Sequence, residues 1–203
     1  MVFASLNFES KLWDSGKTLI CGIDEVGRGC FAGPVVIGAV VFSKKDNIPE
    51  GLADSKLLKP TERVRLSKLI QESASCFAIA EIDVNTINRV GIGEATQIGF
   101  RKVLTLLTKK PDHLLIDAFL IKDISKEIQT PIIHGDRLSA SIAAASIIAK
   151  VYRDDLMVQL DKQYPGYGFS KHKGYGTKEH QEAIHSFGLS KLHRTSFNLS
   201  KFT

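Results

Sequence analysis

Apolar runs separated by polar turns divide this chain into alternating strands and helices. Runs typical of strands cover residues 17–24, 34–42, 76–82, 113–117 and 131–134. Apolar positions at helical spacing cover residues 5–15, 60–73, 92–109, 138–163 and 177–187. Because strands and helices alternate, we predict an α/β fold, and the short Gly/Pro-rich link between the first two strands favours their antiparallel pairing.

The segment 138–152 is apolar or small on nearly every face, which predicts a central helix pressed closely against the sheet. A more polar continuation extends this helix to about residue 163. The chain contains no internal repeat and no low-complexity linker. We therefore predict one compact domain, with a core over residues 1–163 and a small C-terminal helical lobe over residues 164–203.

Two adjacent carboxylates, Asp24 and Glu25, end the first apolar run. Neighbouring strand residues point to opposite faces, so the strand must end or bulge there if both acids serve one site. Gly27 permits such a bulge, and Arg28 follows between two glycines. The pattern resembles a divalent-metal site beside a loop that approaches a ligand closely. The alternative is a hairpin turn with solvated charges.

Two more acids stand at the ends of predicted elements: Asp117 closes a strand, and Asp136 follows Gly135 just before the apolar helix. Strand-end acids converge if their strands are neighbours in the sheet. Clustered acids repel one another unless cations neutralise them, and oxygen-only ligands suit Mg²⁺ or Mn²⁺. Two such ions can activate water and stabilise the leaving oxygen of a phosphodiester. Asp136 as a helix cap and Asp117 as a solvated loop acid remain open alternatives.

The formal net charge of +5 is concentrated late in the chain. Residues 150–203 contain nine Lys and Arg but five Asp and Glu, and they contain all four tyrosines. This favours a polyanionic partner over the alternative of a merely solvated basic surface. Basic and aromatic residues alternate in residues 171–175, as phosphate contacts and stacking require. The candidate contacts are Lys56, Lys150, Arg153, Lys171, His172, Lys173 and Tyr175.

Other classes of protein fit the composition poorly. No apolar run reaches the roughly 18 residues of a membrane span, and the first residues lack a secretory signal. The three cysteines are odd in number and lack metal-ligand spacing, which is typical of buried thiols in a reducing compartment. A nucleophilic role for Cys30 is disfavoured, because no base is implied beside it. We expect a cytoplasmic protein, most simply a monomer.

Several ordered motifs resemble those of the ribonuclease HII family. They are Gly22–Gly29, Ala32–Val36, Asp54–Lys56, Leu115–Asp117, Gly135–Asp136, Ala144–Val151 with Arg153–Asp154, Tyr167–Phe169, His172–Tyr175 and His193–Phe197. The resemblance implies a ribonuclease H-like fold, with three antiparallel strands followed by two parallel ones and a C-terminal helical lobe that binds substrate.

The same resemblance implies a metal-dependent endonuclease acting on the RNA strand of RNA–DNA hybrids and on the 5′ side of single ribonucleotides in duplex DNA, leaving 3′-hydroxyl and 5′-phosphate ends. It implies two Mn²⁺ or Mg²⁺ ions with substrate. The metal-binding acids correspond to Asp24, Glu25, Asp117 and Asp136. The ribose-reading loop corresponds to Gly27, Arg28 and Gly29, and the sugar-packing tyrosine to Tyr175.

The sequence departs from the family pattern at Ala118-Phe119 and at Leu138–Ala140, which bears on substrate preference. The related ribonuclease HIII carries a large extra N-terminal domain, whereas 23 residues precede Asp24 here. A structure-selective DNA nuclease and a non-catalytic nucleic-acid-binding protein are the rival functions. A sliding-clamp contact through Phe197 and Phe202 is disfavoured, because the tail lacks the usual glutamine anchor.

Overall fold

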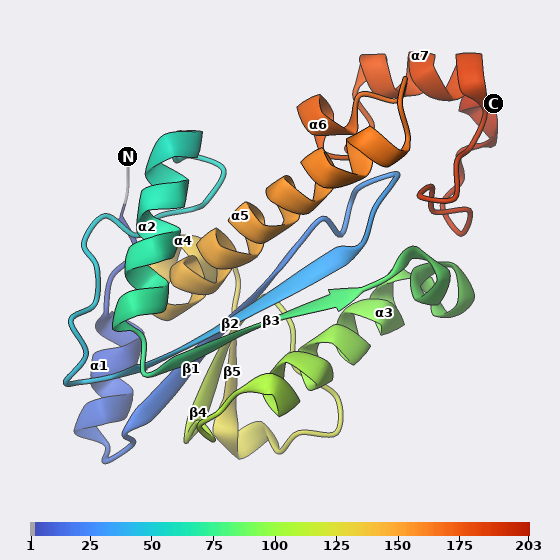
Figure 1. The fold of residues 1–203 in the computed structure, drawn as a ribbon. Helices are drawn as coiled ribbons and strands as arrows, with labels where there is room; N and C mark the ends of the chain where they lie inside the picture. Colours follow the sequence, from blue (N-terminus) through green and yellow to red (C-terminus); the bar gives the residue numbers. More distant parts are fainter. Residues whose placement is uncertain (1–2) are drawn as a thin grey trace.

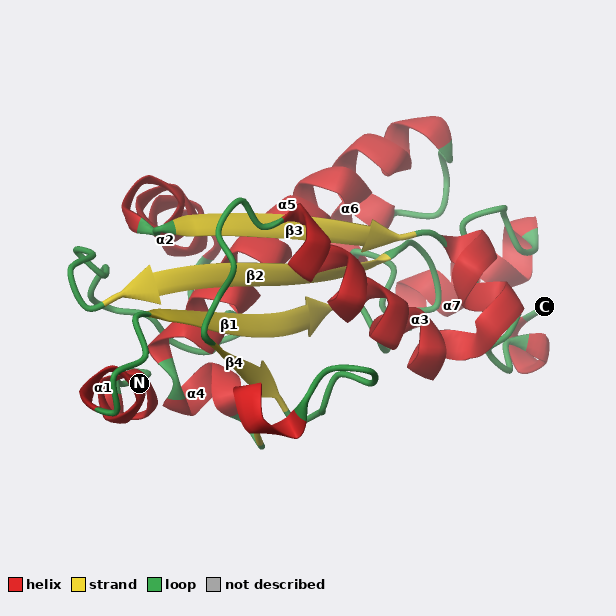
Figure 2. Cartoon of the chain, turned by 90° about the horizontal axis from the view of Figure 1, so that it is seen from below, coloured by secondary structure: helices red, strands yellow, loops and turns green. Residues whose placement is uncertain are grey.

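A five-stranded mixed sheet forms the centre of the computed structural model, which describes residues 3–203 (Figures 1 and 2). Its strands are β1 (Leu19–Val26), β2 (Val35–Ser43), β3 (Cys76–Ile82), β4 (His113–Asp117) and β5 (Gln129–Ile132). The strand order is β3-β2-β1-β4-β5, in which β1 to β3 are antiparallel while β4 and β5 run parallel to β1. The predicted α/β class and strand arrangement are confirmed.

Helices cover both faces of this sheet. They are α1 (Asn7–Asp14), α2 (Pro60–Ser73), α3 (Val84–Leu106), α4 (Gly135–Leu138), α5 (Ala140–Gln163), α6 (Phe169–His172) and α7 (Lys178–Phe187), with short 3₁₀ turns at Lys126–Ile128 and Ser200–Phe202. Helix α3 packs on one face, while α5 and α2 pack on the other. Figure 1 shows α6 and α7 beyond the far end of α5, where the C-terminal lobe is expected.

Small residues bring α5 into close contact with the sheet. A Cβ at Gly22 of β1 would overlap the backbone of Ser141, and one at Gly38 of β2 would overlap the carbonyl of Ala145. Only glycine permits such an approach of a strand to a helix backbone. The helix is buried over its first ten residues, as predicted from its apolar and small composition. Helix α5 therefore fixes the position of β1 and of the acids at its end.

Some boundaries differ from those predicted. Helix α3 begins at Val84, well before the predicted Ile92, because its first turns end at a kink where Gly91 has a φ of 77°. The side chain of Asp83 caps this early segment by accepting from the N–H of Thr86. Strand β5 begins before Pro131, which an edge strand tolerates because it has no partner on one side.

The hydrophobic core includes all three cysteines, which are buried and unpaired as predicted. Within residues 3–203, no helix has the length and apolar character needed to cross a membrane.

Candidate active site

Strand β1 continues without interruption through the two adjacent acids. Asp24 pairs with Gly38 and Glu25 with Ile37, and the strand ends only at Val26. The predicted strand end or bulge at these acids is therefore wrong. Regular alternation sends the two side chains to opposite faces of β1. Both can still belong to one site, because they stand near the carboxyl end of the strand.

Asp24 is buried, with only 5% of its surface exposed, which excludes a solvated hairpin acid. Its pKa is raised well above the ordinary range, mainly because burial disfavours the charged form. The charges of Glu25 and Asp117 raise this pKa further, whereas a hydrogen bond with Ser146 of α5 opposes the shift. Asp24 therefore lies close enough to the other acids for their charges to raise its pKa.

Asp117 and Asp24 stand at corresponding positions on two neighbouring parallel strands. Ile23 of β1 pairs in parallel with Ile116 of β4, so the next residue on each strand is an acid. The carboxylate of Asp117 accepts a hydrogen bond from the backbone N–H of Gly135, with an N–O distance of 2.8 Å. This bond ties the end of β4 to the start of α4. The strands that carry Asp24 and Asp117 are neighbours in the sheet, as the convergence of these acids requires.

Burial raises the pKa of Glu25 to about 7, and the charge of Asp117 adds to the shift while that of Arg28 opposes it. Its Oε2 atom is buried and has no hydrogen-bond partner among residues 3–203. A buried carboxylate oxygen without a donor requires a proton or a cation. Glu25 is therefore suited to hold a positive ion.

Asp136 lies in α4 and is 7% exposed. It does not cap the long helix, because Ser139 accepts from the N–H of Ile142 at that position. Burial raises the pKa of Asp136, and the charges of Asp54 and Asp117 raise it further. Asp136 thus joins the same group of acids.

The structure adds three polar residues to the site, which the sequence analysis included in family motifs without assigning them a role. Asp54 is buried, and its carboxylate accepts from the backbone N–H of Lys56 and from the guanidinium of Arg137. The hydroxyls of Ser55 and Ser146 lie 3.0 Å apart, beside Asp24. The motif Ala144–Val151, which contains Ser146, was the available signal for this contact.

The chemistry of the donor set fits a hard divalent cation. The acids Asp24, Glu25, Asp117 and Asp136 present only oxygen ligands, which Mg²⁺ and Mn²⁺ prefer. Among residues 3–203, however, no three potential ligands converge into a complete binding cluster. Magnesium is commonly held by one or two carboxylates together with water and substrate phosphate, so an incomplete protein shell suits that ion.

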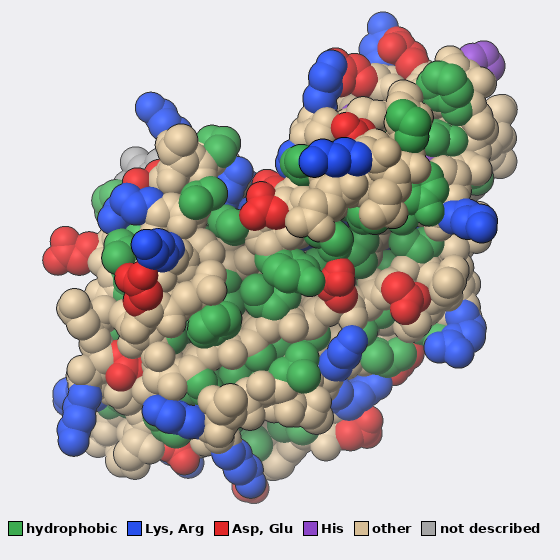
Figure 3. All heavy atoms as spheres, viewed as in Figure 1, with side chains coloured by type: hydrophobic (Ala, Val, Ile, Leu, Met, Phe, Trp, Pro, Cys, Tyr) green, Lys and Arg blue, Asp and Glu red, His purple; other side chains and the backbone are tan. Residues whose placement is uncertain are grey.

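Several predicted substrate contacts come together in a groove of about 510 Å³ between α2, α5 and α6. Figure 3 shows the surface notched between α2 and the C-terminal lobe. Lys150, Lys171, Lys173 and Tyr175 line this groove, and the Lys150 ammonium lies 5.6 Å from the centre of the Tyr175 ring. Lys56 lies elsewhere, near the acids, where its charge lowers the pKa values of Glu25 and Asp136.

Arg153 does not face the groove, so the prediction that it contacts phosphate is wrong. Its side chain is fully buried. The guanidinium donates to backbone carbonyls of Ala32, Pro34 and Lys173. Arg153 therefore holds loops together instead of binding substrate.

His172 contributes to the wall of the groove, but both of its ring nitrogens are used within the protein. Nδ1 accepts from the N–H of Gly174, and Nε2 lies 2.7 Å from the carbonyl oxygen of Tyr167. These partners set the tautomer, with the proton on Nε2. The prediction of a direct contact between this imidazole and substrate is not supported by its position.

The Gly27-Arg28-Gly29 loop connects the acids to the second strand. Gly27 is buried and has a φ of 88°, whereas Gly29 is exposed. The guanidinium of Arg28 lies 4.6 Å from the centre of the Phe119 ring. The departure from the family pattern at Phe119 therefore touches this loop.

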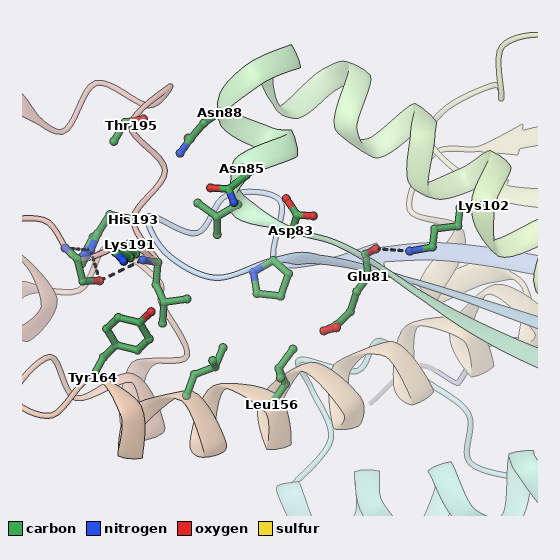
Figure 4. Close-up of a pocket in the computed structure, with 15 residues that line it drawn as sticks. Glu81, Asp83, Asn85, Asn88, Lys102, Leu156, Tyr164, Lys191, His193 and Thr195 are labelled. Carbon is green, nitrogen blue, oxygen red and sulfur yellow. Dashed lines mark hydrogen bonds between the residues drawn. The ribbon is translucent and has the colours of Figure 1, made fainter.

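A separate cavity of about 750 Å³ lies between the start of α3, α5 and residues 190–195. Figure 4 shows Asp83, Asn85 and Asn88 on one side of this cavity, with Tyr164 and Leu156 on the other. None of the four predicted metal-binding acids lines it. The cavity is distinct from the acid cluster.

Comparisons with known proteins bear on the family and on the fold of this chain. Residues 21–200 match the family model described as Ribonuclease HII. The chain is 47% identical over 95% of its length to the ribonuclease HII of Anaeromyxobacter sp. (strain Fw109-5), 49% over 94% to that of Clostridioides difficile (strain 630), and 46% over 97% to that of Acholeplasma laidlawii (strain PG-8A). It spans 60%, 74% and 96% of these relatives, respectively.

Solved structures support the fold. The ribonuclease H2 of Pyrococcus horikoshii OT3 has a TM-score of 0.74 at 24% identity, with 90% of this chain and 95% of that chain covered. Ribonuclease HII of Archaeoglobus fulgidus, solved with PCNA, gives 0.72 at 24%, covering 89% and 96%. Bst ribonuclease HIII with Mn²⁺ gives 0.68 at 22%, covering 92% and 69%.

The fold and the family match together identify a hydrolytic endonuclease of the ribonuclease H type. Within that class the chain belongs to the ribonuclease HII family, because the family model spans most of its length. The resemblance drawn from the sequence motifs is thereby confirmed.

Proposed function

We propose that this protein hydrolyses the RNA strand of RNA–DNA hybrids and also cleaves duplex DNA on the 5′ side of a single ribonucleotide. The products are a 3′-hydroxyl and a 5′-phosphate end. The observation that carries the proposal is the cluster of four acids. Within it, the pKa of Asp24 is raised by burial and by the charges of Glu25, Asp117 and Asp136. Such a cluster is costly unless cations neutralise it.

Asp24, Glu25, Asp117 and Asp136 would hold Mg²⁺ or Mn²⁺, with two ions present when substrate is bound. Bound ions of this kind activate water and stabilise the leaving oxygen of a phosphodiester. Asp24 is the best candidate for a ligand shared between the two ions, because all three other acids affect its pKa. The hydrogen bonds around Asp54 and Ser146 hold the surrounding backbone in place.

Recognition of the ribose is assigned to the loop of Gly27, Arg28 and Gly29 together with Tyr175. A 2′-hydroxyl both donates and accepts hydrogen bonds, and it distinguishes RNA from DNA at a given site. Backbone groups reach it only where the chain comes close, as the exposed Gly29 allows. Tyr175 offers a flat ring for the neighbouring sugar, at the edge of the basic groove.

Phosphate binding is assigned to the lysines of the groove and to Lys56. Lys150, Lys171 and Lys173 line the same groove, which suits a nucleic-acid backbone. The Lys150 ammonium is paired with Asp154 at 2.6 Å, so Lys171 and Lys173 are the stronger candidates. Arg153 and His172 contribute by holding loops in position. We include no sliding-clamp contact, because Phe202 of the tail packs on Phe31, with ring centres 5.4 Å apart.

The test compares four end-labelled duplexes: an RNA–DNA hybrid, an RNA duplex, a DNA duplex, and a DNA duplex with one ribonucleotide. Each is incubated with Mg²⁺, Mn²⁺ or a chelator. We expect metal-dependent cleavage of the hybrid and of the single-ribonucleotide duplex, with a 5′-phosphate on the downstream fragment. Cleavage that ignores the 2′-hydroxyl would instead indicate a structure-selective DNA nuclease. Binding without any product in metal would indicate a nucleic-acid-binding protein.

A further inference from the structure

Arg194, in the segment that follows α7, is fully buried beneath the Gly27-Arg28-Gly29 loop. Nη1 donates to the carbonyl of Arg28 (2.8 Å), Nη2 donates to the carbonyls of Gly27 (2.7 Å) and Gly33 (2.8 Å), and Nε donates to Gly33 (3.0 Å). Among residues 3–203 it has no acidic partner. Its charge is therefore stabilised by backbone carbonyls.

A buried cation held by carbonyls imposes an orientation on the peptide groups that bind it. Losing one of these bonds would leave a charged group or a carbonyl unsatisfied in the interior, which is costly. The burial of this guanidinium is strong enough to lower its pKa to about 10. The carbonyls of Gly27 and Arg28 are consequently fixed toward the interior.

The N–H groups of those same peptide units point away from the two carbonyls. In a trans peptide the N–H points away from the C=O, and the described residues contain no cis peptide bond. The N–H groups that accompany the two fixed carbonyls belong to Arg28 and Gly29. Neither donates to an acceptor within residues 3–203. Two adjacent donors are thus left free, one on the exposed Gly29 and one on the half-buried Arg28.

The closing segment that carries Arg194 is itself held in place. Its N–H donates to the carbonyl of Phe31, and the neighbouring His193 forms an antiparallel bridge with Ala32. Ser196 contacts Asn88 at the start of α3 through its N–H and hydroxyl. Figure 4 shows His193 and Thr195 of this segment beside the cavity that α3 borders. The segment is therefore held in place both before and after Arg194.

We propose that Arg194 is a positioning residue for ribose recognition: it holds the carbonyls of Gly27 and Arg28 inward and so presents the N–H groups of Arg28 and Gly29 to the sugar edge of a ribonucleotide. This inference rests on the proposed function. It assigns to the C-terminal segment a part in reading the substrate, although Arg194 does not touch it.

The test uses Arg194→Lys, which keeps the charge but cannot bond three carbonyls in a fixed planar arrangement. Phe100→Leu, in the core on the α3 face, is the control for lost stability alone. The readouts are the affinity for a single-ribonucleotide duplex relative to the same all-DNA duplex, in chelator, and the amide resonances of Arg28 and Gly29. We expect Arg194→Lys to lower the affinity ratio by about tenfold, or about 1.4 kcal/mol, and to shift both resonances. Phe100→Leu should leave both readouts as in the wild type.

A wild-type protein without any preference for the ribonucleotide would contradict the proposed function itself. A wild-type preference that Arg194→Lys retains, with unshifted amides, would contradict only the positioning role. Failure of Arg194→Lys to fold would also count against it, since the guanidinium would then be a requirement of the fold as a whole. Equal losses in Arg194→Lys and Phe100→Leu would assign the effect to stability and contradict the inference.

Discussion

Gly27 lies directly against the guanidinium group of Arg153, and this contact leaves no room for a Cβ at position 27. The φ of 88° at Gly27 is a second reason for glycine there. Two residues later, Gly29 has an ordinary φ, and a Cβ on it would meet nothing within 4 Å. The structure thus requires the first glycine for the fold and leaves the second free for an approaching ligand.

The two glycines should respond differently to substitution by alanine. Gly27→Ala should lower the free energy of unfolding by about 1–3 kcal/mol, because it combines a strained φ with a steric overlap. Gly29→Ala should keep the wild-type melting temperature but cleave a single-ribonucleotide duplex slowly, because the methyl group would occupy space meant for the sugar. Thermal melts and cleavage rates decide this. Full activity in Gly29→Ala would place the substrate elsewhere.

Tyr175 is the second predicted sugar contact. Burial raises its pKa to about 12, so its hydroxyl stays protonated at neutral pH and can donate a hydrogen bond. Tyr175→Ala should reduce cleavage of a lone ribonucleotide more than cleavage of a long hybrid, with little change in melting temperature. Tyr152→Ala, at an exposed position of α5, serves as the control. If Tyr175→Ala instead loses both activities equally and melts earlier, the ring serves the packing of the lobe.

The basic groove should supply affinity through the release of counterions. Replacing both Lys171 and Lys173 by alanine should reduce the slope of log K against log salt concentration by up to about 2, roughly one unit for each lost phosphate contact. The matched control replaces Lys109 and Lys110, which are exposed and remote from the groove. Titrations at several salt concentrations give both slopes. An unchanged slope in the groove variant would mean that this loop faces away from nucleic acid.

A pair of buried histidines predicts a pH dependence of stability in the C-terminal lobe. The Nε2 atoms of His180 and His193 lie 3.1 Å apart, and burial lowers both pKa values to about 4. Since unfolding restores an ordinary pKa of about 6.5, the unfolded chain binds more protons between these values. The pair therefore stabilises the fold above about pH 6.5, and this stability is lost as the pH falls toward 4.

The raised carboxyl pKa values at the active site act in the opposite direction, because those groups gain protons first in the folded state. The histidine contribution is therefore measured as the difference in unfolding free energy between the wild type and a histidine variant, in which the carboxyl contribution cancels. The unfolding free energy of the wild type minus that of His193→Gln should shrink by up to about 3 kcal/mol between pH 6.5 and 4. The same difference for His185→Gln, at an exposed position, should stay constant. A constant difference for His193→Gln as well would show that its imidazole titrates normally.

Much of the fold could be predicted because the signals are local. The boundaries of α2 and β3 match the predicted ranges, since Pro60 starts one element and strict alternation marks the other. The early turns of α3 were missed, because Gly91 interrupts the helical pattern. The four acids proposed for the site were also singled out from local signals, because a carboxylate at or near the end of an apolar run is conspicuous in the sequence.

The direction in which a side chain points could not be predicted. Arg153 and His172 have the residue types of phosphate contacts, yet Arg153 donates to the distant carbonyl of Pro34 and His172 to the carbonyl of Tyr167, five residues earlier. The partners of Arg194 lie more than 160 residues earlier in the sequence, as the separations of 161, 166 and 167 residues show. The contacts of Arg153 and Arg194 depend on the tertiary structure, which the periodicity of the sequence does not reveal.

Asp24→Asn removes one carboxylate from the buried acid cluster that is proposed to hold the metal ions for cleavage. Cleavage of a DNA duplex with one ribonucleotide should be measured at saturating Mg²⁺ and Mn²⁺ for this variant and the wild type. Activity should fall below about a tenth of the wild-type rate, because the substitution removes a ligand proposed to be shared by both ions. The melting temperature without metal should not fall, because the substitution removes a charge that its neighbours repel. An Asp24→Asn protein that folds and retains more than about a tenth of the rate, or a wild type that cleaves in chelator, would contradict the account.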